Sequence, residues 1–480
     1  MDLTDKLLKV TLLHTNDIHS HFEEMPKIVS LMQRLKSELD ERYVCTVDVG
    51  DHMDRMRSET EGTDGIANIA VMNQTGYEVT VPGNNEGLTF TKESLAEAYG
   101  EHAHFPVVCS NLFESDTGLP PVWLHPFSLL RKGELTIGFI GLTARYTEFY
   151  SLLGWHITDP FAAAEETVKL LQEKADIIVA LSHLGYANDQ RLAAEVPGIH
   201  VILGAHTHHL LPEPVRIGDA YVCAAGKFGQ YVGEVDIWFD LQRRSVRSVT
   251  GRCHSVRDEV PDSGMERLIG SYRLQGERSL NRVVAALDEP LAIDWEKESG
   301  LGNLLASGVR RWTGSEIGLV NAGQLLGSLC AGAVTRGDLL HICPSPINPC
   351  RMLLTGRQIV QALEEALLPE FIDKPLMGFG FRGKRLGTLC LDGIAVRYVA
   401  DAEPYRKIRQ VTVNGVPMIE EQEYAVGTLD MFTFRIGYLS LSEGREVSYY
   451  LPEFIRDVLE EQLHNREALL GCKEQRWLPV

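Results

Sequence analysis

The sequence lacks an apolar run long enough to cross a membrane. Its first residues, MDLTDKLLKVTLLHTND, place acids before a short apolar run, and no small-residue cleavage site follows. A membrane-spanning helix needs about 20 mostly apolar residues. A signal peptide needs a basic start and a cleavage site. We therefore expect neither a signal peptide nor a membrane partner.

Positive charge is also scarce. The 480 residues contain 46 Lys and Arg against 66 Asp and Glu, which gives a formal net charge of -20. Proteins bind nucleic-acid polymers through basic surfaces, so this balance argues against a nucleic-acid partner. It does not exclude a small phosphorylated substrate, because bound metal ions can reverse the local field.

Cysteine pairs of the Cys-x-x-Cys type are absent. The nine cysteines are scattered along the chain, their number is odd, and several lie in apolar runs typical of strands. This pattern favours buried free thiols over disulfides or a zinc site. It indicates a cytoplasmic protein.

The chain is too long for one hydrophobic core, and it contains two stretches in which strands and helices alternate. In the first stretch, apolar runs such as residues 9–15 are followed by helical patterns such as residues 26–39. Such alternation predicts an α/β fold. The pattern weakens and becomes charged near residues 252–279, and a second α/β stretch follows. We predict a first domain, a linker and a second domain at 1–250, 251–280 and 281–480.

Residues of metal-binding type follow five of the predicted strands in the first half. In chain order they are Asp17 and His19, then Asp51, then Asn84 and Asn85, then His183, then His206, His208 and His209. Ligands of α/β sheets bind past the carboxyl ends of the strands. Residues two apart in extended chain point the same way, so paired residues can present two ligands to one spot.

The ligand types indicate a pair of ions. Imidazole with carboxylate suits manganese, iron, zinc or nickel, whereas magnesium prefers oxygen alone. One tetrahedral ion needs only four ligands. Two ions about 3.5–4 Å apart and bridged by a carboxylate are used for phosphoester hydrolysis. Asp51 stands alone after its strand and is the predicted bridge. A single histidine at a strand end is usually an ordinary polar residue, but five such ends would need five coincidences.

The blocks HTNDIHSHF, DVGD, PGNNE, SHLG and GAHTHH resemble the five blocks of the calcineurin-like metallophosphoesterases. Their order and the second half resemble the 5′-nucleotidase / UDP-sugar hydrolase family in particular. The resemblance implies a four-layer α-β-β-α sandwich followed by a smaller α/β substrate domain. It also implies one metal held by Asp17, His19, Asp51 and His208, and another held by Asp51, Asn84, His183 and His206. His14, His21 and His209 match no ligand position.

The third block departs from the family pattern. The family usually has Gly-Asn-His-Glu-x-Asp, in which the His and Asp form a catalytic dyad, whereas this chain has GNNEGL. Asn85 and Leu88 stand at the dyad positions, and the metal-ligand position is kept as Asn84. An amide donates a hydrogen bond but carries neither charge nor proton. We assign Asn84 and Asn85 to the catalytic site. Without general acid assistance, which is worth roughly 10²–10⁴-fold, metals alone would act at a reduced rate, unless His102 or His104 reaches in.

The second half resembles the family's substrate-specificity domain, with changes. The block NAGQLL places Leu326 where the family has a phosphate-binding arginine. The segment GFGFRGKR resembles a P-loop, but strands follow it, so we expect a glycine-rich substrate-side loop. The predicted substrate-binding residues are Arg310, Arg311, Phe379, Phe381 and Tyr438. Burial of these aromatics in the core is an equally good interpretation.

These patterns predict a dimetal-dependent phosphoester hydrolase that acts on nucleotides, with manganese as the expected metal and zinc, iron or nickel as alternatives. One alternative is a nucleotide-sugar diphosphatase or a 2′,3′-cyclic phosphodiesterase. Another is a metal-retaining nucleotide-binding or regulatory protein with little catalysis. The complete ligand set argues against the last, because seven polar ligands are costly to bury without use.

Overall fold

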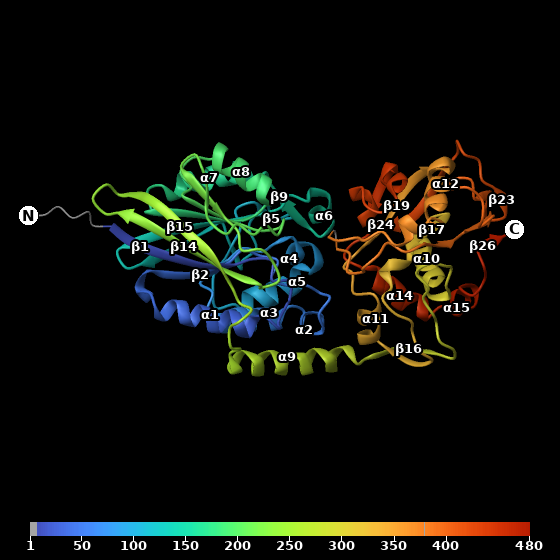
Figure 1. Cartoon of the computed structure of the whole chain (residues 1–480), viewed down its shortest axis with the longest axis horizontal. Helices are drawn as coiled ribbons and strands as arrows, with labels where there is room; N and C mark the ends of the chain where they lie inside the picture. The colour runs from blue at the N-terminus through green and yellow to red at the C-terminus, as the bar shows by residue number, and fades with distance from the viewer. Residues whose placement is uncertain (1–6, 379) are drawn as a thin grey trace, which may run out of the picture. The chain divides into compact units, whose positions relative to one another are not determined.

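The computed structural model describes residues 7–378 and 380–480. The chain divides into two compact units, Met1–Gly276 and Glu277–Val480 (Figure 1). Each unit contains its own hydrophobic core and its own sheets. No helix in these described ranges is both long and apolar enough to cross a bilayer.

The first unit contains two main sheets. In spatial order the seven-stranded sheet consists of β15 (Ser245–Ser255), β14 (Tyr231–Asp240), β1 (Leu7–Thr15), β2 (Val44–Asp48), β3 (Val79–Thr80), β4 (Val107–Val108) and β6 (Leu124–His125). The six-stranded sheet consists of β12 (Val215–Ile217), β13 (Ala220–Cys223), β11 (Val201–Gly204), β10 (Ile177–His183), β8 (Leu135–Thr143) and β7 (Phe127–Lys132). A small extra pair joins β5 (Leu112–Glu114) to β9 (Trp155–Ile157).

The two sheets pack face to face. One core cluster contains side chains from both, such as Leu13 and Val47 from one sheet and Phe139 and Val179 from the other. At Gly141 the approach is so close that a Cβ atom would lie 1.9 Å from the carbonyl oxygen of Val108. Only glycine permits that approach.

Helices cover the outer faces of both sheets, which gives four layers. Figure 1 shows α7 and α8 on one side of the first unit and α1 and α3 on the other. The helices of this unit are α1 (Met25–Ser37), α2 (Ser58–Glu61), α3 (Ile66–Thr75), α4 (Asn84–Thr89), α5 (Lys92–Leu95), α6 (Thr147–Leu152), α7 (Pro160–Leu171) and α8 (Tyr186–Glu195). The predicted α-β-β-α sandwich is therefore confirmed.

Local sequence explains where these elements begin and end. Asp159 caps α7 by accepting hydrogen bonds from the backbone of Phe161 and Ala162, and Pro160 fills the first helical position. Helix α3 ends at Gly76, which has a left-handed φ of 78°. All seven residues of β10 are buried, as expected for a strand covered on both faces.

The segment 251–280 contains the end of β15 and the 18-residue helix α9 (Ser263–Leu280). After it, the second unit is built around a five-stranded sheet of β20 (Leu389–Asp392), β17 (Ile317–Asn321), β24 (Glu423–Leu429), β19 (Pro349–Thr355) and β25 (Arg445–Tyr449). A four-stranded sheet contains β23 (Val416–Pro417), β22 (Ile408–Val413), β21 (Ile394–Tyr398) and β26 (Trp477–Pro479). A further pair joins β16 (Val283–Leu287) to β18 (Gly332–Thr335).

The helices of the second unit pack on these sheets. They are α10 (Gly300–Trp312), α11 (Arg336–Ile342), α12 (Gly356–Glu365), α13 (Pro369–Ile372), α14 (Ile455–Leu463) and α15 (Arg466–Gly471). Helix α12 begins with a capping box, in which Thr355 and Gln358 exchange hydrogen bonds with each other's backbone. Strands β20 and β21 follow the glycine-rich segment, as the sequence predicted, so this segment is not a P-loop.

Candidate metal centre

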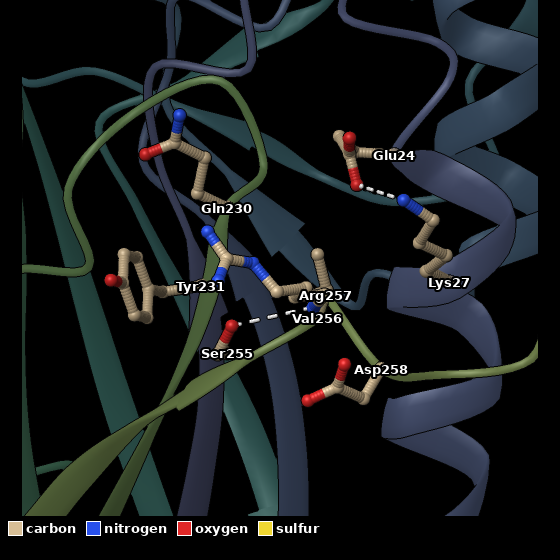
Figure 2. Close-up of a pocket in the computed structure, with 8 residues that line it drawn as sticks. All are labelled: Glu24, Lys27, Gln230, Tyr231, Ser255, Val256, Arg257 and Asp258. Carbon is tan, nitrogen blue, oxygen red and sulfur yellow. Dashed lines mark hydrogen bonds and ion pairs between the residues drawn. The ribbon is translucent and has the colours of Figure 1, made fainter.

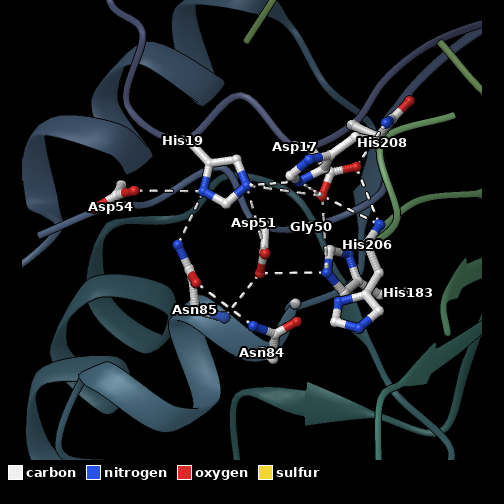
Figure 3. Close-up of polar contacts among 12 residues, drawn as sticks. Asp17, His19, Gly50, Asp51, Asp54, Asn84, Asn85, His183, His206 and His208 are labelled. Atoms are coloured by element: carbon white, nitrogen blue, oxygen red, sulfur yellow. Dashed lines mark hydrogen bonds and ion pairs between the residues drawn. The ribbon is translucent and has the colours of Figure 1, made fainter. Parts of the chain in front are cut away.

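The loops that follow β1 and β2 are joined by backbone hydrogen bonds. The amide of Asp17 donates to the carbonyl of Gly50 at 3.0 Å, and the amide of His19 donates to the carbonyl of Asp51 at 2.8 Å. In the other sheet β10 runs parallel to β11, so His183 and the loop that contains His206 emerge at one edge. Figure 3 shows how these side chains gather into one cluster.

Five residues of this cluster have left-handed backbone conformations. Their φ angles are 51° at Asp17, 48° at His19, 50° at Asp51, 72° at His206 and 59° at His208. This region is uncommon for residues other than glycine and costs free energy. Strained backbone of this kind collects at functional sites, so its presence on three separate loops supports a functional cluster.

One group of the cluster consists of Asp17, His19 and His208. The two imidazoles face each other with their Nε2 atoms 3.3 Å apart. The Oδ1 atom of Asp17 lies 3.5 Å from Nε2 of His208 and 3.9 Å from Nε2 of His19. These three atoms lie close enough together to hold one metal ion.

A second group consists of Asp51, His183 and His206. The Nδ1 atom of His183 lies 2.7 Å from the carbonyl of Val49, to which it can only donate. That hydrogen bond orients the ring so that Nε2 faces Asp51, from where it can bind a cation in exchange for its proton. The Nε2 atom is buried, has no hydrogen bond, and lies 3.3 Å from Oδ1 of Asp51.

Asp51 faces both groups. Its Oδ1 atom approaches His183 of the second group, and its Oδ2 atom lies 3.7 Å from Nε2 of His19 in the first. The backbone amide of Asn85 donates to Oδ1 of Asp51 at 2.8 Å and holds the carboxylate in this orientation. Only 3% of Asp51 is exposed, so water screens these contacts little.

Asn84 and Asn85 begin helix α4. The Oδ1 atom of Asn84 is buried and has no hydrogen-bond partner. A buried, unpaired amide oxygen is costly, and a cation beside it removes that cost. The Nδ2 atom of Asn85 lies 3.0 Å from Nδ1 of His19 and donates to the carbonyl of Met53 at 3.2 Å. The unpaired atoms of Asn84 and His183 fit a site for divalent cations.

Burial and charge shift the protonation of these groups in opposite directions. Burial alone would lower the pKa of His183, but the carboxylates of Asp51 and Asp17 raise it to about 10. Burial favours the neutral form of Asp51 too, yet the charges of His183 and His19 and the hydrogen bonds to Asp51 together outweigh it and lower the pKa of Asp51. Burial lowers the pKa of His206 to about 4 and that of His208 to about 3. Both imidazoles are neutral at pH 7, which metal binding requires.

Three polar side chains next to the cluster were not predicted. The Oδ2 atom of Asp54, a buried residue, lies 3.5 Å from Nδ1 of His19. The hydroxyl of Tyr146 lies 3.2 Å from Nε2 of His206. Glu86 accepts hydrogen bonds from the amides of residues 51, 53 and 83 and so ties two loops together. Asp54 follows Asp51 by three residues in the block GDHMD, and that proximity was the available signal.

The other histidines named from the sequence lie outside both groups. His21 contacts Glu23 at 2.8 Å, and His209 contacts Thr207 at 2.9 Å. His14 is buried in β1, where burial lowers its pKa to about 4. His102 and His104 are exposed, and the backbone of each forms a hydrogen bond with the side chain of Asn73. These two therefore do not supply the imidazole that position 85 lacks.

The residues predicted to bind substrate have other contacts in the second unit. Tyr438 is fully buried and its hydroxyl donates to the carbonyl of Gly387 at 2.6 Å. Phe381 is 4% exposed and belongs to the same core cluster. Arg310 pairs with Asp392 at 2.5 Å. Arg311 is exposed, and Phe379 lies outside the described residues. Their part in substrate binding stays a prediction.

Comparison with known proteins agrees with this architecture. A family model described as calcineurin-like phosphoesterase matches residues 10–210, and one described as 5′-nucleotidase, C-terminal domain, matches residues 283–434. The uncharacterized metallophosphoesterase YunD of Bacillus subtilis is 37% identical over 459 residues, which cover 95% of this chain and 99% of that protein. A 5′-nucleotidase of Vibrio cholerae is 23% identical over 423 residues, which cover 75% of this chain and 76% of that protein.

Solved structures share the fold. The 5′-nucleotidase precursor of Thermus thermophilus has a TM-score of 0.62 at 22% identity, with 98% of this chain and 99% of that chain covered. The NAD nucleotidase of Haemophilus influenzae has a TM-score of 0.69 at 16% identity, with 99% and 98% covered. The chain therefore belongs to the calcineurin-like metallophosphoesterases with a 5′-nucleotidase C-terminal domain, a family of metal-dependent phosphoester hydrolases.

Proposed function

We propose that this protein is a dimetal-dependent phosphoester hydrolase that acts on nucleotides. One observation carries the proposal: the carboxylate of Asp51 faces an imidazole of each group, at 3.3 Å and 3.7 Å. A carboxylate shared by two neighbouring groups of ligands is the arrangement that two-metal phosphoesterases use.

The proposed ligands divide between two ions. Asp17, His19 and His208 would hold one ion, His183, His206 and Asn84 would hold the other, and Asp51 would serve both. The mixture of imidazole and carboxylate favours manganese over magnesium and leaves zinc, iron and nickel as alternatives. When bound, such ions polarise a phosphoester and activate water for its hydrolysis.

Asn85 occupies the position at which the family's catalytic histidine is expected. Its amide can donate a hydrogen bond but cannot transfer a proton. The protein therefore depends on the metals and on the leaving group itself. We expect the fastest turnover on esters whose leaving groups need no protonation.

The names of similar proteins support a nucleotide substrate, since they include a 5′-nucleotidase and an NAD nucleotidase. A nucleotide-sugar diphosphatase or a 2′,3′-cyclic phosphodiesterase is the alternative within the same chemistry. All nine cysteines are free thiols and seven are buried, which supports a reducing compartment and hence the cytoplasm.

A substrate panel with added manganese tests the proposal. It should contain nucleoside 5′-monophosphates, a nucleotide sugar, a 2′,3′-cyclic nucleotide and p-nitrophenyl phosphate. We expect the highest kcat/KM with a 5′-monophosphate among the nucleotides. Faster cleavage of the sugar or cyclic compound would favour the alternative. If the protein binds nucleotides but its turnover does not exceed that of an Asp51→Asn control, a metal-retaining binding protein becomes the better interpretation.

A further inference from the structure

The loop between β13 and β14 is tied to the loop that carries the first metal-binding group. The side chain of Asn16 accepts a hydrogen bond from the amide of Ala225 at 3.0 Å and donates one to the carbonyl of Gly226 at 2.7 Å. The amide of Phe228 donates to the carbonyl of Asp17 at 2.7 Å. Phe228 has a left-handed φ of 59°, which is costly for a residue other than glycine. The chain therefore holds Phe228 in a strained conformation beside a proposed metal ligand.

The ring of Phe228 packs against the imidazoles of the first group. Its centroid lies 5.8 Å from that of His19 and 6.2 Å from that of His208. The ring of His21 lies 4.2 Å from it, centroid to centroid. The strained loop thus places an aromatic wall beside two proposed ligands of one ion.

Lys227 brings a positive charge to this wall. Its ammonium group lies 4.5 Å from the centroid of the Phe228 ring. Within residues 7–378 and 380–480, no carboxylate lies within 4.0 Å of that ammonium group, and it makes no hydrogen bond. Burial, together with the charges of His19 and Lys227, lowers the pKa of His208 to about 3, so the charge of Lys227 acts on the first group.

A second lysine of the same unit provides the contrast. Lys27 lines a polar cavity of about 510 Å³, shown in Figure 2, and donates to Glu24 at 2.9 Å. Gln230, three residues after Lys227, lines the same cavity. The charge of Lys27 is balanced by a carboxylate, whereas the charge of Lys227 faces an aromatic ring.

The first group has an uncharged neighbour at position 85. The Nδ2 atom of Asn85 lies 3.0 Å from Nδ1 of His19, and the resemblance to the family implies a histidine at this position. An amide cannot carry the positive charge of an imidazolium. His19 therefore has the uncharged Asn85 as one neighbour and the ring that carries Lys227 as another.

We propose that Lys227 contacts a phosphoryl oxygen of the substrate and that its charge makes the site prefer phosphomonoesters to phosphodiesters. An ammonium group is a compact charge with three donors on a flexible stem, so it can move from the ring to an oxygen atom. A contact with a ring at a partly exposed site is weaker than a charge-assisted hydrogen bond. At about pH 8 a monoester carries almost two negative charges, since its second pKa is about 6, whereas a diester carries one.

This inference rests on the proposed function, and the binding of orthophosphate tests it without turnover. Calorimetry at about pH 8 on the full chain loaded with manganese measures the affinity. We expect Lys227→Met to weaken phosphate binding by roughly 10–100-fold, since a charge-assisted contact is lost. Lys227→Arg keeps the charge and should stay within about threefold of wild type.

The matched control is Arg257→Met, which removes an equal charge from an exposed residue that lines the cavity of Figure 2. We expect it to leave phosphate affinity within about twofold of wild type, because water and salt screen an exposed charge. All three variants should bind as much manganese as wild type, because neither residue is among the proposed ligands. Equal phosphate affinities in Lys227→Met and Arg257→Met, or loss of manganese from Lys227→Met, would overturn the inference.

Steady-state kinetics test the preference between the two classes of ester. The substrates are p-nitrophenyl phosphate and bis(p-nitrophenyl) phosphate, which have the same leaving group and differ in charge. We expect Lys227→Met to lower kcat/KM for the monoester by roughly tenfold more than for the diester, because attraction to a cation grows with the charge of the substrate. A purely structural defect would lower both values equally, and that result would overturn the proposed preference. A wild-type chain that binds no manganese would instead contradict the hydrolase proposal, and the inference with it.

Discussion

The two units use buried charge in opposite ways. In the first unit the buried carboxylate of Asp51 stands among imidazoles, and the charge of His183 lowers its pKa. In the second unit the buried carboxylate of Asp430 accepts hydrogen bonds from the backbone amides of Asn348 and Met431, and burial raises its pKa to about 7. The first arrangement keeps the carboxylate of Asp51 ionised, as cation binding requires, whereas the second favours the neutral form of Asp430.

The cationic side chains differ in the same sense. The two candidate metal-binding groups consist of carboxylates and imidazoles, whereas Arg382, Lys384 and Arg385 line a cavity of about 460 Å³ in the second unit, called here the second-unit cavity. A metal centre requires strict ligand geometry, and the proposed ligands stand at the positions that the resemblance to the family implies. Leu326, which stands where the family has a phosphate-binding arginine, lines this second-unit cavity together with those cations.

The largest effect is expected at Asp51. Asp51→Asn removes the one carboxylate that faces both groups, and we expect kcat to fall by at least roughly 10³-fold, since both ions lose a charged ligand. The control is Asp48→Asn in the neighbouring strand. Burial raises the pKa of Asp48 to about 8, so its side chain is already neutral at pH 7. Steady-state assays should show a loss of less than roughly tenfold for the control. Equal losses in the two variants would contradict a special role for Asp51.

The next largest effect is expected at Asp54, which contacts the imidazole of His19. Asp54 lies 3.5 Å from Nδ1 of His19 and orients its other nitrogen toward the metal-binding group. We expect Asp54→Asn to lower metal affinity by roughly 10–100-fold, measured by competition with a fluorescent chelator. Asp40→Asn, on an exposed residue, is the control. Unchanged metal affinity with reduced turnover would show that Asp54 acts on substrate instead.

The next prediction concerns Asp430, the buried acid of the second unit, and the pH dependence of the free energy of unfolding. The folded-state pKa of Asp430 lies near 7, above its ordinary value of 3.8. Its protonation therefore stabilises the fold fully below about pH 4, and this stability is lost as pH rises through 7. Asp430→Asn is always neutral and avoids that loss. Relative to wild type, the variant should gain about 1–3 kcal/mol between pH 5 and pH 8 in denaturant unfolding. An equal difference at both pH values would contradict the raised pKa.

The smallest effect is expected at Tyr438, where a substitution distinguishes a structural role in the core from a role in substrate binding. Tyr438→Phe removes the hydrogen bond to Gly387 and leaves the ring in the core. We expect a loss of about 1 kcal/mol in the free energy of unfolding and a KM within about twofold of wild type. A raised KM with unchanged stability would instead support the substrate role predicted from the sequence.

The gathering of the proposed ligands could be predicted because each follows a strand whose apolar pattern is plain. Parallel pairing places Thr15 beside Asp48 and Ser182 beside Gly204, so the loops after these strands meet at one edge of each sheet. Two sheets packed face to face then bring those edges together. The left-handed backbone of the ligand residues left no trace in the sequence pattern.

The rest depended on tertiary packing. The role of Asp54 depends on the orientation of His19, which spacing alone does not determine. The burial of Tyr438 depends on its packing in the second core, where its hydroxyl donates to the carbonyl of Gly387 in a loop distant in sequence. The second-unit cavity combines Trp295 with Arg382, which come from separate segments joined only by the fold. Short-range patterns identify strand ends well, but they do not identify the partners of a side chain.

Anomalous diffraction from crystals soaked in manganese tests the central claim most directly. The account predicts two peaks about 3.5–4 Å apart, one against Asp17, His19 and His208 and one against His183, His206 and Asn84, with Asp51 between them. A single ion, or manganese bound away from Asp51, would contradict it.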